Sequence, residues 1–131
     1  MSKQVIGCSN SIIDKIIDIP NKTVLNTLIV SLPSAGKTTL LRDIARNISD
    51  GNNYLEGQTV GIVDERGEIA ACYKGVPQND VGIRTDVLSN VPKHLGIKML
   101  IRSMAPNIIV VDEIGNEEDA KALHYAICSR N

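Results

Sequence analysis

The chain has 131 residues, 43% apolar and 22% charged, a composition typical of one globular domain with a buried core. Its 14 basic and 15 acidic residues leave a formal net charge of −1, so no long-range positive field favours nucleic acid. The absence of Trp and Phe also removes the rings on which single-stranded nucleic-acid binders usually stack bases. We therefore expect no nucleic-acid partner.

Cysteine usage and hydropathy indicate the compartment. Cys8, Cys72 and Cys128 are odd in number and widely spaced, which favours reduced thiols over a disulfide framework or a zinc site. The N-terminal sequence has no apolar stretch of signal-peptide length, and the aliphatic runs are much shorter than a bilayer span. We expect a cytoplasmic protein, either free or peripheral at the cytoplasmic face of a membrane.

The first third of the chain predicts a helix, a strand and a second helix. Residues 1–22 are expected to form an amphipathic lead-in helix or linker, and residues 23–131 the core of a single domain. The run TVLNTLIV, residues 23–30, is typical of a buried parallel strand. A helical pattern then extends over 36–49. Its apolar face consists of Leu40, Leu41, Ile44, Ala45 and Ile48.

Two more strands and two more helices are predicted downstream. The runs TVGIVD at 59–64 and NIIVVD at 107–112 again resemble buried parallel strands. Residues 74–86 read as a long irregular segment, and a helix within 93–105 is closed by Pro106. The last helix begins at Asn116 as N-cap and is expected to bury Ala120, Leu123 and Ile127. Alternating strands and helices predict an α/β domain with a mostly parallel sheet flanked by helices.

The stretch SLPSAGKT, residues 31–38, matches the phosphate-loop pattern G-x-x-x-x-G-K-[ST] except at Ser31. Such a loop turns backbone amides towards phosphate oxygens, Lys37 reaches the β and γ phosphates, and the Thr38 hydroxyl binds Mg²⁺. Because an aliphatic run precedes it and a helix follows, the motif predicts a P-loop NTPase that binds ATP and Mg²⁺. The expected nucleotide contacts are Pro33, Ser34, Ala35, Gly36, Lys37, Thr38 and Thr39.

Carboxylates at two strand ends are candidates for the metal and for water activation. Asp112 is expected in the Mg²⁺ sphere together with Thr38, and Glu113 is expected to act as the base. The sequence DERGE, which begins at Asp64, ends another strand and competes for the same role through Glu65 and Glu68. The uninterrupted aliphatic run before Asp112 favours the later strand end, and both alternatives stay open at this point.

A cationic side chain commonly neutralises the γ-phosphate during transfer. Arg66, Arg84 and Arg102 are the candidates, and Arg66 ranks first because it lies beside an acidic strand end. A surface role is the alternative for each of the three.

Four motifs between about Val24 and Ala126 resemble the stage III sporulation protein AA ATPases of endospore-forming bacteria. They are NTLIVSLPSAGKTTLLRDIAR, VGIVDERGEIAACYKGVPQNDVGIRTDVL, the PK at residues 92–93, and MLIRSMAPNIIVVDEIGNEEDA. The resemblance implies a RecA-like fold similar to that of secretion ATPases, a hexameric homo-oligomeric ring, and membrane-embedded channel or secretion proteins as partners. By the same resemblance Glu65 and Glu68 correspond to the acidic box of secretion ATPases.

The function expected from these features is ATP binding and Mg²⁺-dependent ATP hydrolysis by a mechanoenzyme, which the resemblance links to a channel between mother cell and forespore. Two alternatives are a nucleotide-binding switch or scaffold with little turnover, and a nucleic-acid translocase of the same fold. RecA-like ATPases continue into a further strand between the strands that end at Val30 and Asp112. The domain is therefore expected to be incomplete at its C-terminus.

Overall fold

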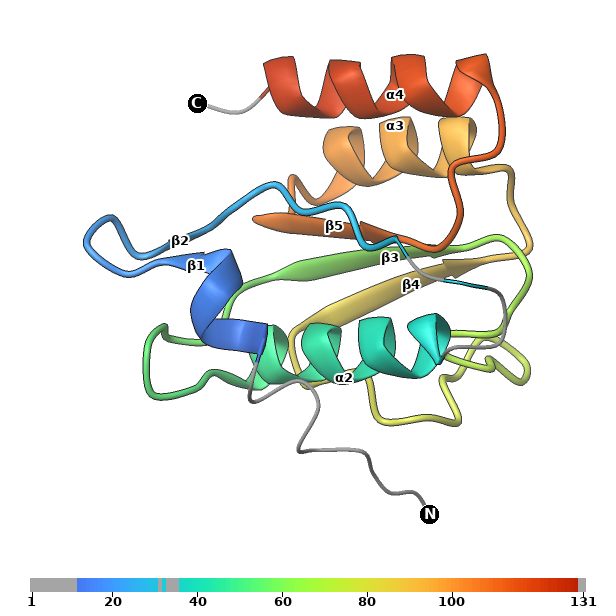
Figure 1. Ribbon diagram of the computed structural model, residues 1–131. Helices are drawn as coiled ribbons and strands as arrows, with labels where there is room; N and C mark the ends of the chain where they lie inside the picture. The colour runs from blue at the N-terminus through green and yellow to red at the C-terminus, as the bar shows by residue number, and fades with distance from the viewer. Residues whose placement is uncertain (1–11, 31, 33–35, 130–131) are drawn as a thin grey trace.

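The computed structural model describes residues 12–30, 32 and 36–129 (Figure 1). A three-stranded sheet lies in the middle, helix α2 covers one face, and helices α3 and α4 lie on the other side (Figure 1). The elements in chain order are β1 (Ile17–Asp18), β2 (Thr23–Val24), α2 (Lys37–Asp50), β3 (Val60–Asp64), β4 (Thr85–Ser89), α3 (Lys93–Ser103), β5 (Ile108–Val111) and α4 (Glu117–Cys128).

The sheet has the order β4-β3-β5, and both strand pairs are parallel. Every residue of β3 is buried, as expected for a central strand that helices cover on both faces. The strands predicted at 59–64 and 107–112 are confirmed as β3 and β5. Because the three strands run in one direction, their carboxyl ends lie at the same edge of the sheet.

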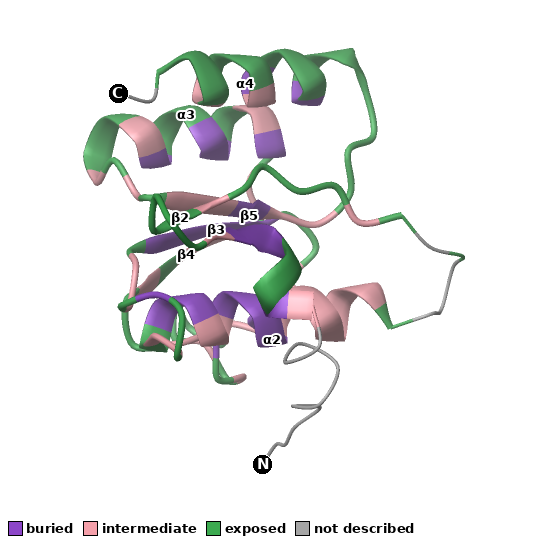
Figure 2. Ribbon diagram, turned by 60° about the vertical axis from the view of Figure 1, so that its left-hand side comes forward, coloured by how far each residue is buried: buried purple, intermediate pink, exposed green. Residues whose placement is uncertain are grey.

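Helix α2 packs on the sheet through the apolar face that the sequence predicts. Ile44, Ala45 and Ile48 are buried in the larger core cluster, and Leu40 and Leu41 pack against it (Figure 2). Gly51 ends the helix as C-cap with φ 98° and ψ 159°, a positive-φ conformation that suits glycine. The predicted helix at 36–49 is thus confirmed within one residue at each end.

Helix α3 covers the opposite face, and α4 lies against α3 (Figure 1). A side chain at Gly96 would approach Val63 to 2.6 Å, so glycine permits the close packing of α3 on β3. Asn116 caps α4 by accepting a hydrogen bond from the Asp119 amide at 2.9 Å, as predicted. The predicted buried face of α4 is right for Leu123, which packs against the core, and wrong for Ala120 and Ile127, which are exposed, while Ala122 is buried instead.

The strand predicted over 23–30 is also wrong for most of its length. Only Thr23–Val24 is a strand, and it pairs antiparallel with β1 rather than joining the parallel sheet. Residues 25–30 are not assigned to a strand, and Leu28 and Val30 are 78% and 82% exposed. An aliphatic run becomes a buried strand only where a neighbouring strand pairs with it, and none of the described strands pairs with this segment.

Residues 12–16 are helical and are followed directly by the β1–β2 pair. Ile13, Ile16 and Ile17 are buried in the same cluster as the apolar face of α2. This part of the predicted lead-in segment therefore packs on the core and does not behave as a linker. No helix within 12–30 or 36–129 combines the length and the apolarity that crossing a bilayer requires.

Candidate functional site

The N-terminus of α2 lies at the carboxyl edge of the sheet, where the phosphate-loop motif predicts a ligand. Gly36 is the N-cap with φ 88°, a conformation that L-residues rarely adopt. The first intrahelical hydrogen bond runs from the Leu40 amide to Gly36, at 3.0 Å. The amides of Lys37, Thr38 and Thr39 therefore precede the intrahelical ladder and suit an anion. The expected contacts at Pro33, Ser34 and Ala35 lie outside the described residues, as does Ser31.

Asp112 follows β5 directly and lies within the electrostatic range of this helix start. Partial burial raises the pKa of Asp112, and the carboxylates of Glu68, Asp64 and Glu113 raise it further. Lys37 acts in the opposite direction and lowers the Asp112 pKa. The structure therefore brings together Lys37, Asp112 and the two competing acidic strand ends, and a divalent cation would relieve the repulsion among these carboxylates.

Asp64, at the end of β3, organises the loop that follows it. Its side chain is fully buried, and its two oxygens accept hydrogen bonds from the amides of Glu68, Ile69 and Ala70 at 2.9, 3.2 and 2.9 Å. A carboxylate that accepts three backbone hydrogen bonds has little capacity left for a metal or a water. Asp64 is thus a structural anchor of the segment 64–70, which we call the acidic loop.

The same loop is also held from α2. The Arg42 guanidinium donates from Nε to the Ile69 carbonyl at 2.6 Å and from Nη2 to the Glu68 carbonyl at 2.8 Å. The Asn79 side chain donates to the Ile69 carbonyl at 3.1 Å. The backbone around Glu68 and Ile69 is therefore fixed on its N–H side by Asp64 and on its carbonyl side by Arg42.

Glu65 is engaged by a lysine that sequence reasoning missed. Lys93, the first residue of α3, is buried, and its Nζ donates to Glu65 Oε1 at 2.5 Å. The hydrogen bond from Lys93 lowers the pKa of Glu65. Because this carboxylate already neutralises a buried ammonium group, Glu65 is a weak candidate for the base.

Arg66 and Glu113 form an ion pair across the two strand ends, with 3.2 Å between Nη2 and Oε1. Both side chains are more than half exposed. They line a hollow of about 220 Å³ together with Glu65, Lys93, Gly115, Asn116 and Asp119. The structure thus brings the predicted arginine and the predicted base into direct contact with each other.

The residues predicted to bind the metal are Thr38 and Asp112. No group of three or more His, Cys, Asp or Glu side chains in 12–30 or 36–129 is arranged to hold a metal ion. Mg²⁺ commonly keeps several waters and takes only one or two protein ligands in addition to substrate phosphates. One hydroxyl and one carboxylate at this edge fit that donor set once phosphates are bound.

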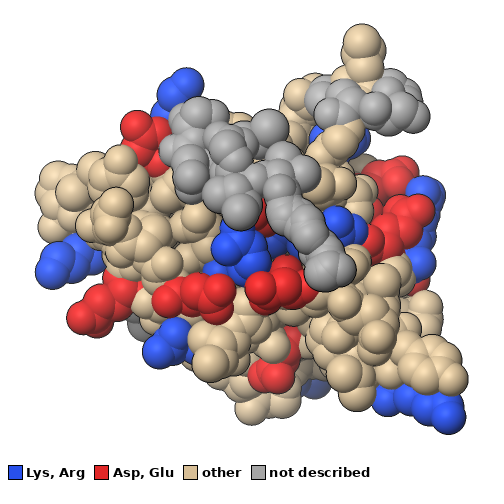
Figure 3. All heavy atoms as spheres, turned by 90° about the horizontal axis from the view of Figure 1, so that it is seen from below, with Lys and Arg blue, Asp and Glu red and all other residues tan. Residues whose placement is uncertain are grey.

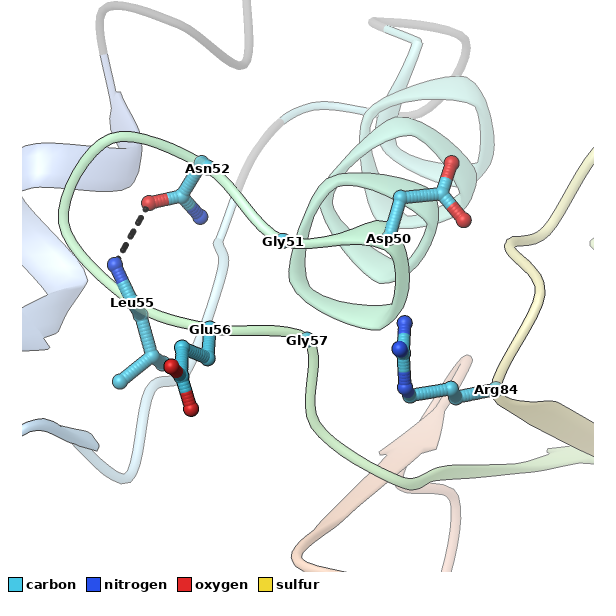
Figure 4. Close-up of a pocket in the computed structure, with 7 residues that line it drawn as sticks. All are labelled: Asp50, Gly51, Asn52, Leu55, Glu56, Gly57 and Arg84. Carbon is cyan, nitrogen blue, oxygen red and sulfur yellow. Dashed lines mark hydrogen bonds between the residues drawn. The ribbon is translucent and has the colours of Figure 1, made fainter.

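A larger hollow, about 620 Å³, lies at the other end of α2 (Figure 4). It is lined by residues 50–52 and 55–57 and by Arg84, which donates from Nη1 to the Ser49 carbonyl at 3.1 Å. The 14 residues of α2 separate this hollow from Lys37 by about 20 Å. Arg84 therefore supports the C-terminal end of α2 and cannot reach phosphates at its N-terminus within one chain. Arg102 lies in the last turn of α3, also remote from Lys93 at the acidic edge.

The surface that carries α2 has acidic and basic side chains side by side (Figure 3). Neither sign forms a continuous field on the described part of this face (Figure 3). A nucleic-acid track would need aligned Lys and Arg side chains. The described residues on this face thus offer no such track.

Two residues that sequence reasoning missed, Arg42 and Lys93, act through other residues. Lys93 follows Pro92 at a helix start, where a cation opposes the helix dipole, and this unfavourable position is a weak signal of a specific partner. Arg42 had no signal of its own, because an arginine in an amphipathic helix normally reads as a solvated side chain.

Comparison with known proteins identifies the family. The family model "Sporulation stage III, protein AA" matches residues 1–130. The chain is 53% identical over 103 residues to "Stage III sporulation protein AA" of Bacillus subtilis (strain 168), covering 79% of this chain and 34% of that protein. It is 35% identical over 97 residues to "Protein SEEDLING PLASTID DEVELOPMENT 1" of Arabidopsis thaliana, covering 72% of this chain and 14% of that protein.

A third relative is "Uncharacterized protein ycf45" of Porphyra purpurea, 34% identical over 97 residues and matched over 16% of its length. The chain thus spans about a third or less of the curated relatives it matches. No solved structure matches it. On the family match and the identity to the Bacillus protein, the chain belongs to the stage III sporulation protein AA family.

Proposed function

We propose that this chain binds Mg-ATP at the N-terminus of α2 and hydrolyses it, as the core of a P-loop ATPase with a RecA-like fold. The observation that carries the proposal is that Lys37, at a helix start capped by a left-handed glycine, lies within electrostatic range of Asp112, which directly follows a parallel strand. A polyphosphate would receive backbone amides and an ammonium group from α2, and its Mg²⁺ would receive a carboxylate from β5.

Each residue at the edge has a distinct role in this proposal. Lys37 neutralises the β and γ phosphates, while Thr38 and Asp112 hold Mg²⁺. Glu113 polarises the attacking water after it leaves Arg66, and Arg66 then stabilises charge on the γ-phosphate. ATP and Mg²⁺ supply the electrophilic phosphorus and the charge neutralisation, so the protein contributes positioning and electrostatics.

Family membership suggests the oligomeric state, the location and the partners of the proposed ATPase. We propose that the chain acts in a homo-oligomeric ring, hexameric as in secretion ATPases, at the cytoplasmic face of a membrane. The partners would be membrane-embedded channel or secretion proteins. The name of the Bacillus relative, "Stage III sporulation protein AA", supports a role in sporulation.

The test is nucleotide binding and phosphate release by the purified protein with and without Mg²⁺. Lys37→Ala should abolish binding or turnover, because it removes the positive charge expected on the phosphates. Glu113→Gln should retain ATP binding and lower turnover about 100-fold or more. Unchanged ATP affinity together with unchanged turnover in Lys37→Ala would overturn the assignment.

One observation favours the alternative of a nucleotide-binding switch with little turnover. The proposed base Glu113 is ion-paired with Arg66 rather than directed at a water. If this pair persists with nucleotide bound, Glu113 stays neutralised and hydrolysis is slow. Arg66→Ala separates the two functions, since it should release Glu113 and raise basal turnover in a switch, but lower turnover in an ATPase that uses Arg66 on the γ-phosphate.

A further inference from the structure

The backbone of the acidic loop is held at two adjacent peptide groups by side chains from two different elements. Asp64 of β3 accepts the amides of Glu68, Ile69 and Ala70, and Arg42 of α2 donates to the carbonyls of Glu68 and Ile69. Fixing both the N–H and the C=O of Glu68 removes the freedom of its backbone. The direction in which its side chain leaves the loop is then set by Asp64 and Arg42 together.

The arginine lies on the helix whose first turn forms the proposed phosphate site. Lys37 and Arg42 are five residues apart, within less than two turns, so a shift of the helix start moves the guanidinium with it. The planar guanidinium makes two hydrogen bonds in a fixed fork, which transmits a displacement better than a single flexible ammonium group can. Arg42 therefore connects the start of α2 with the acidic loop through a short and directional link.

Three other acidic side chains at this edge are already engaged. Glu65 is paired with Lys93, Glu113 with Arg66, and Asp64 with three amides. Glu68 is exposed, and its own backbone is the part of the loop that Arg42 contacts. Its carboxylate is thus the one whose placement depends most directly on α2.

We propose that Arg42 is a positioning residue that holds Glu68 beside Asp112, so that phosphates seated at the start of α2 bring the Glu68 carboxylate into the metal and water site. This inference rests on the proposed function. Arg42 itself touches neither phosphate nor metal, and acts through the two carbonyls that it binds. Loss of Arg42 should therefore impair the step that uses Glu68 and spare nucleotide binding.

The first test measures Mg-ATP turnover of wild type, Arg42→Gln, Glu68→Gln and the double variant. Arg42→Gln should lower kcat about tenfold or more with KM changed less than about twofold, since misplacement of a catalytic group affects the chemical step. In the Glu68→Gln background the same change should cost less than about twofold, because the two residues act as one unit. Multiplicative effects of the two single changes would overturn the proposal.

Arg46→Gln is the matched control on the same helix. Arg46 pairs with Asp43 one turn away within α2 and makes no hydrogen bond to the acidic loop among the described residues. Gln can still donate to Asp43, so kcat should stay within about twofold of wild type. Arg42→Lys keeps the charge and the apolar stem but loses the fork, and should restore only part of the lost turnover.

The second test measures hydrogen exchange in the acidic loop and does not require ATP hydrolysis. Amide hydrogen exchange of Glu68, Ile69 and Ala70 should be at least about tenfold faster in Arg42→Gln than in wild type, with exchange of β3 unchanged. If wild type fails to hydrolyse ATP while this exchange difference is present, the proposed function is wrong, but Arg42 is still shown to hold the acidic loop in place. Equal exchange in both proteins, or faster exchange with unchanged kcat, would refute the positioning role.

Discussion

Two regions meet at the carboxyl edge of the sheet, and they are built very differently. The acidic loop, residues 64–70, is fixed by a buried carboxylate that accepts from its amides and by an arginine that donates to its carbonyls. The segment 25–30, which leads towards the phosphate side, is extended and leaves Leu28 and Val30 exposed. The acidic loop is thus held by side chains of the protein itself, whereas Leu28 and Val30 gain little stability from burial.

The largest effect should follow removal of the anchor of the acidic loop. Asp64→Ala leaves three buried amides without their acceptor, which should lower the free energy of unfolding by about 3–5 kcal/mol. Urea denaturation measures this, with Asp86→Ala on the exposed side of β4 as a control that should change stability by less than about 0.5 kcal/mol. A loss below about 1 kcal/mol for Asp64→Ala would show that the loop is not held through this carboxylate.

A smaller effect is expected at the link between the acidic loop and α3. Glu65→Ala leaves the buried Lys93 ammonium without its partner, so the free energy of unfolding should fall by about 1–3 kcal/mol at pH 7. The pKa of Glu65 is lowered in the folded state, so its contribution is present above its unfolded pKa and is lost as pH falls through the folded one.

The difference between Glu65→Ala and wild type should therefore vanish at acid pH. Glu117→Ala offers the comparison, because Glu117 pairs with Lys121 on the exposed surface of α4. That change should cost no more than about 0.5 kcal/mol. Equal losses for the two variants would mean that burial of Lys93 has no energetic consequence.

A change of the opposite sign is expected at Asp112. Its pKa is raised in the folded state, so the ionised carboxylate destabilises the fold as pH rises through the folded pKa. Asp112→Asn should therefore raise the thermal midpoint at pH 7 without Mg²⁺, by roughly 1–5 °C, and the gain should shrink as pH falls. The same variant should lose the Mg²⁺ dependence of nucleotide binding. Thermal melting at pH 5 and pH 7 measures the first effect, and a lower midpoint at pH 7 would contradict it.

The smallest effect is predicted in the segment 25–30. Leu28→Ser and Val30→Ser should each change the free energy of unfolding by less than about 0.5 kcal/mol, because both side chains are already exposed. Ile29 provides the contrast within the same segment, since it packs against the core cluster and Ile29→Ser should cost more. If Leu28→Ser costs about 2 kcal/mol or more, then this segment is buried in solution, as the sequence first suggested.

Local patterns predicted most of the helices and two of the three sheet strands. The periodicity of 36–49, the aliphatic runs before Asp64 and Asp112, and the Asn116 cap each depend on residues close together in sequence, and the structure confirms them. Strand β4 was missed because TDVLS is short and follows a loop rich in Gly, Asn and Asp. Its pairing with β3 is a tertiary property that its own sequence does not display.

In the candidate site, too, local sequence predicted the positions of some residues but not the partners of others. Local signals fix the positions of Gly36, as cap of α2, and of Asp112, directly after β5, and Lys37 lies close enough to Asp112 to lower its pKa. Which acidic residue is free to act could not be read from DERGE and VVDE, since it depends on partners elsewhere in the chain. Lys93 and Arg42 are 28 and 26 residues from the loop atoms they bind, beyond the reach of any local pattern.

The parallel sheet also governs how this protein reaches its fold. Val60 pairs with Thr85 on one side and with Ile108 on the other, so the central strand acquires its neighbours from distant parts of the chain. The described strands of this sheet form no hairpin that could nucleate it from a local contact. Folding is therefore expected on the millisecond to second timescale, and the residues of β3 that become buried stay without strand partners until late. A newly made chain would be most susceptible to aggregation in that interval, before β5 arrives.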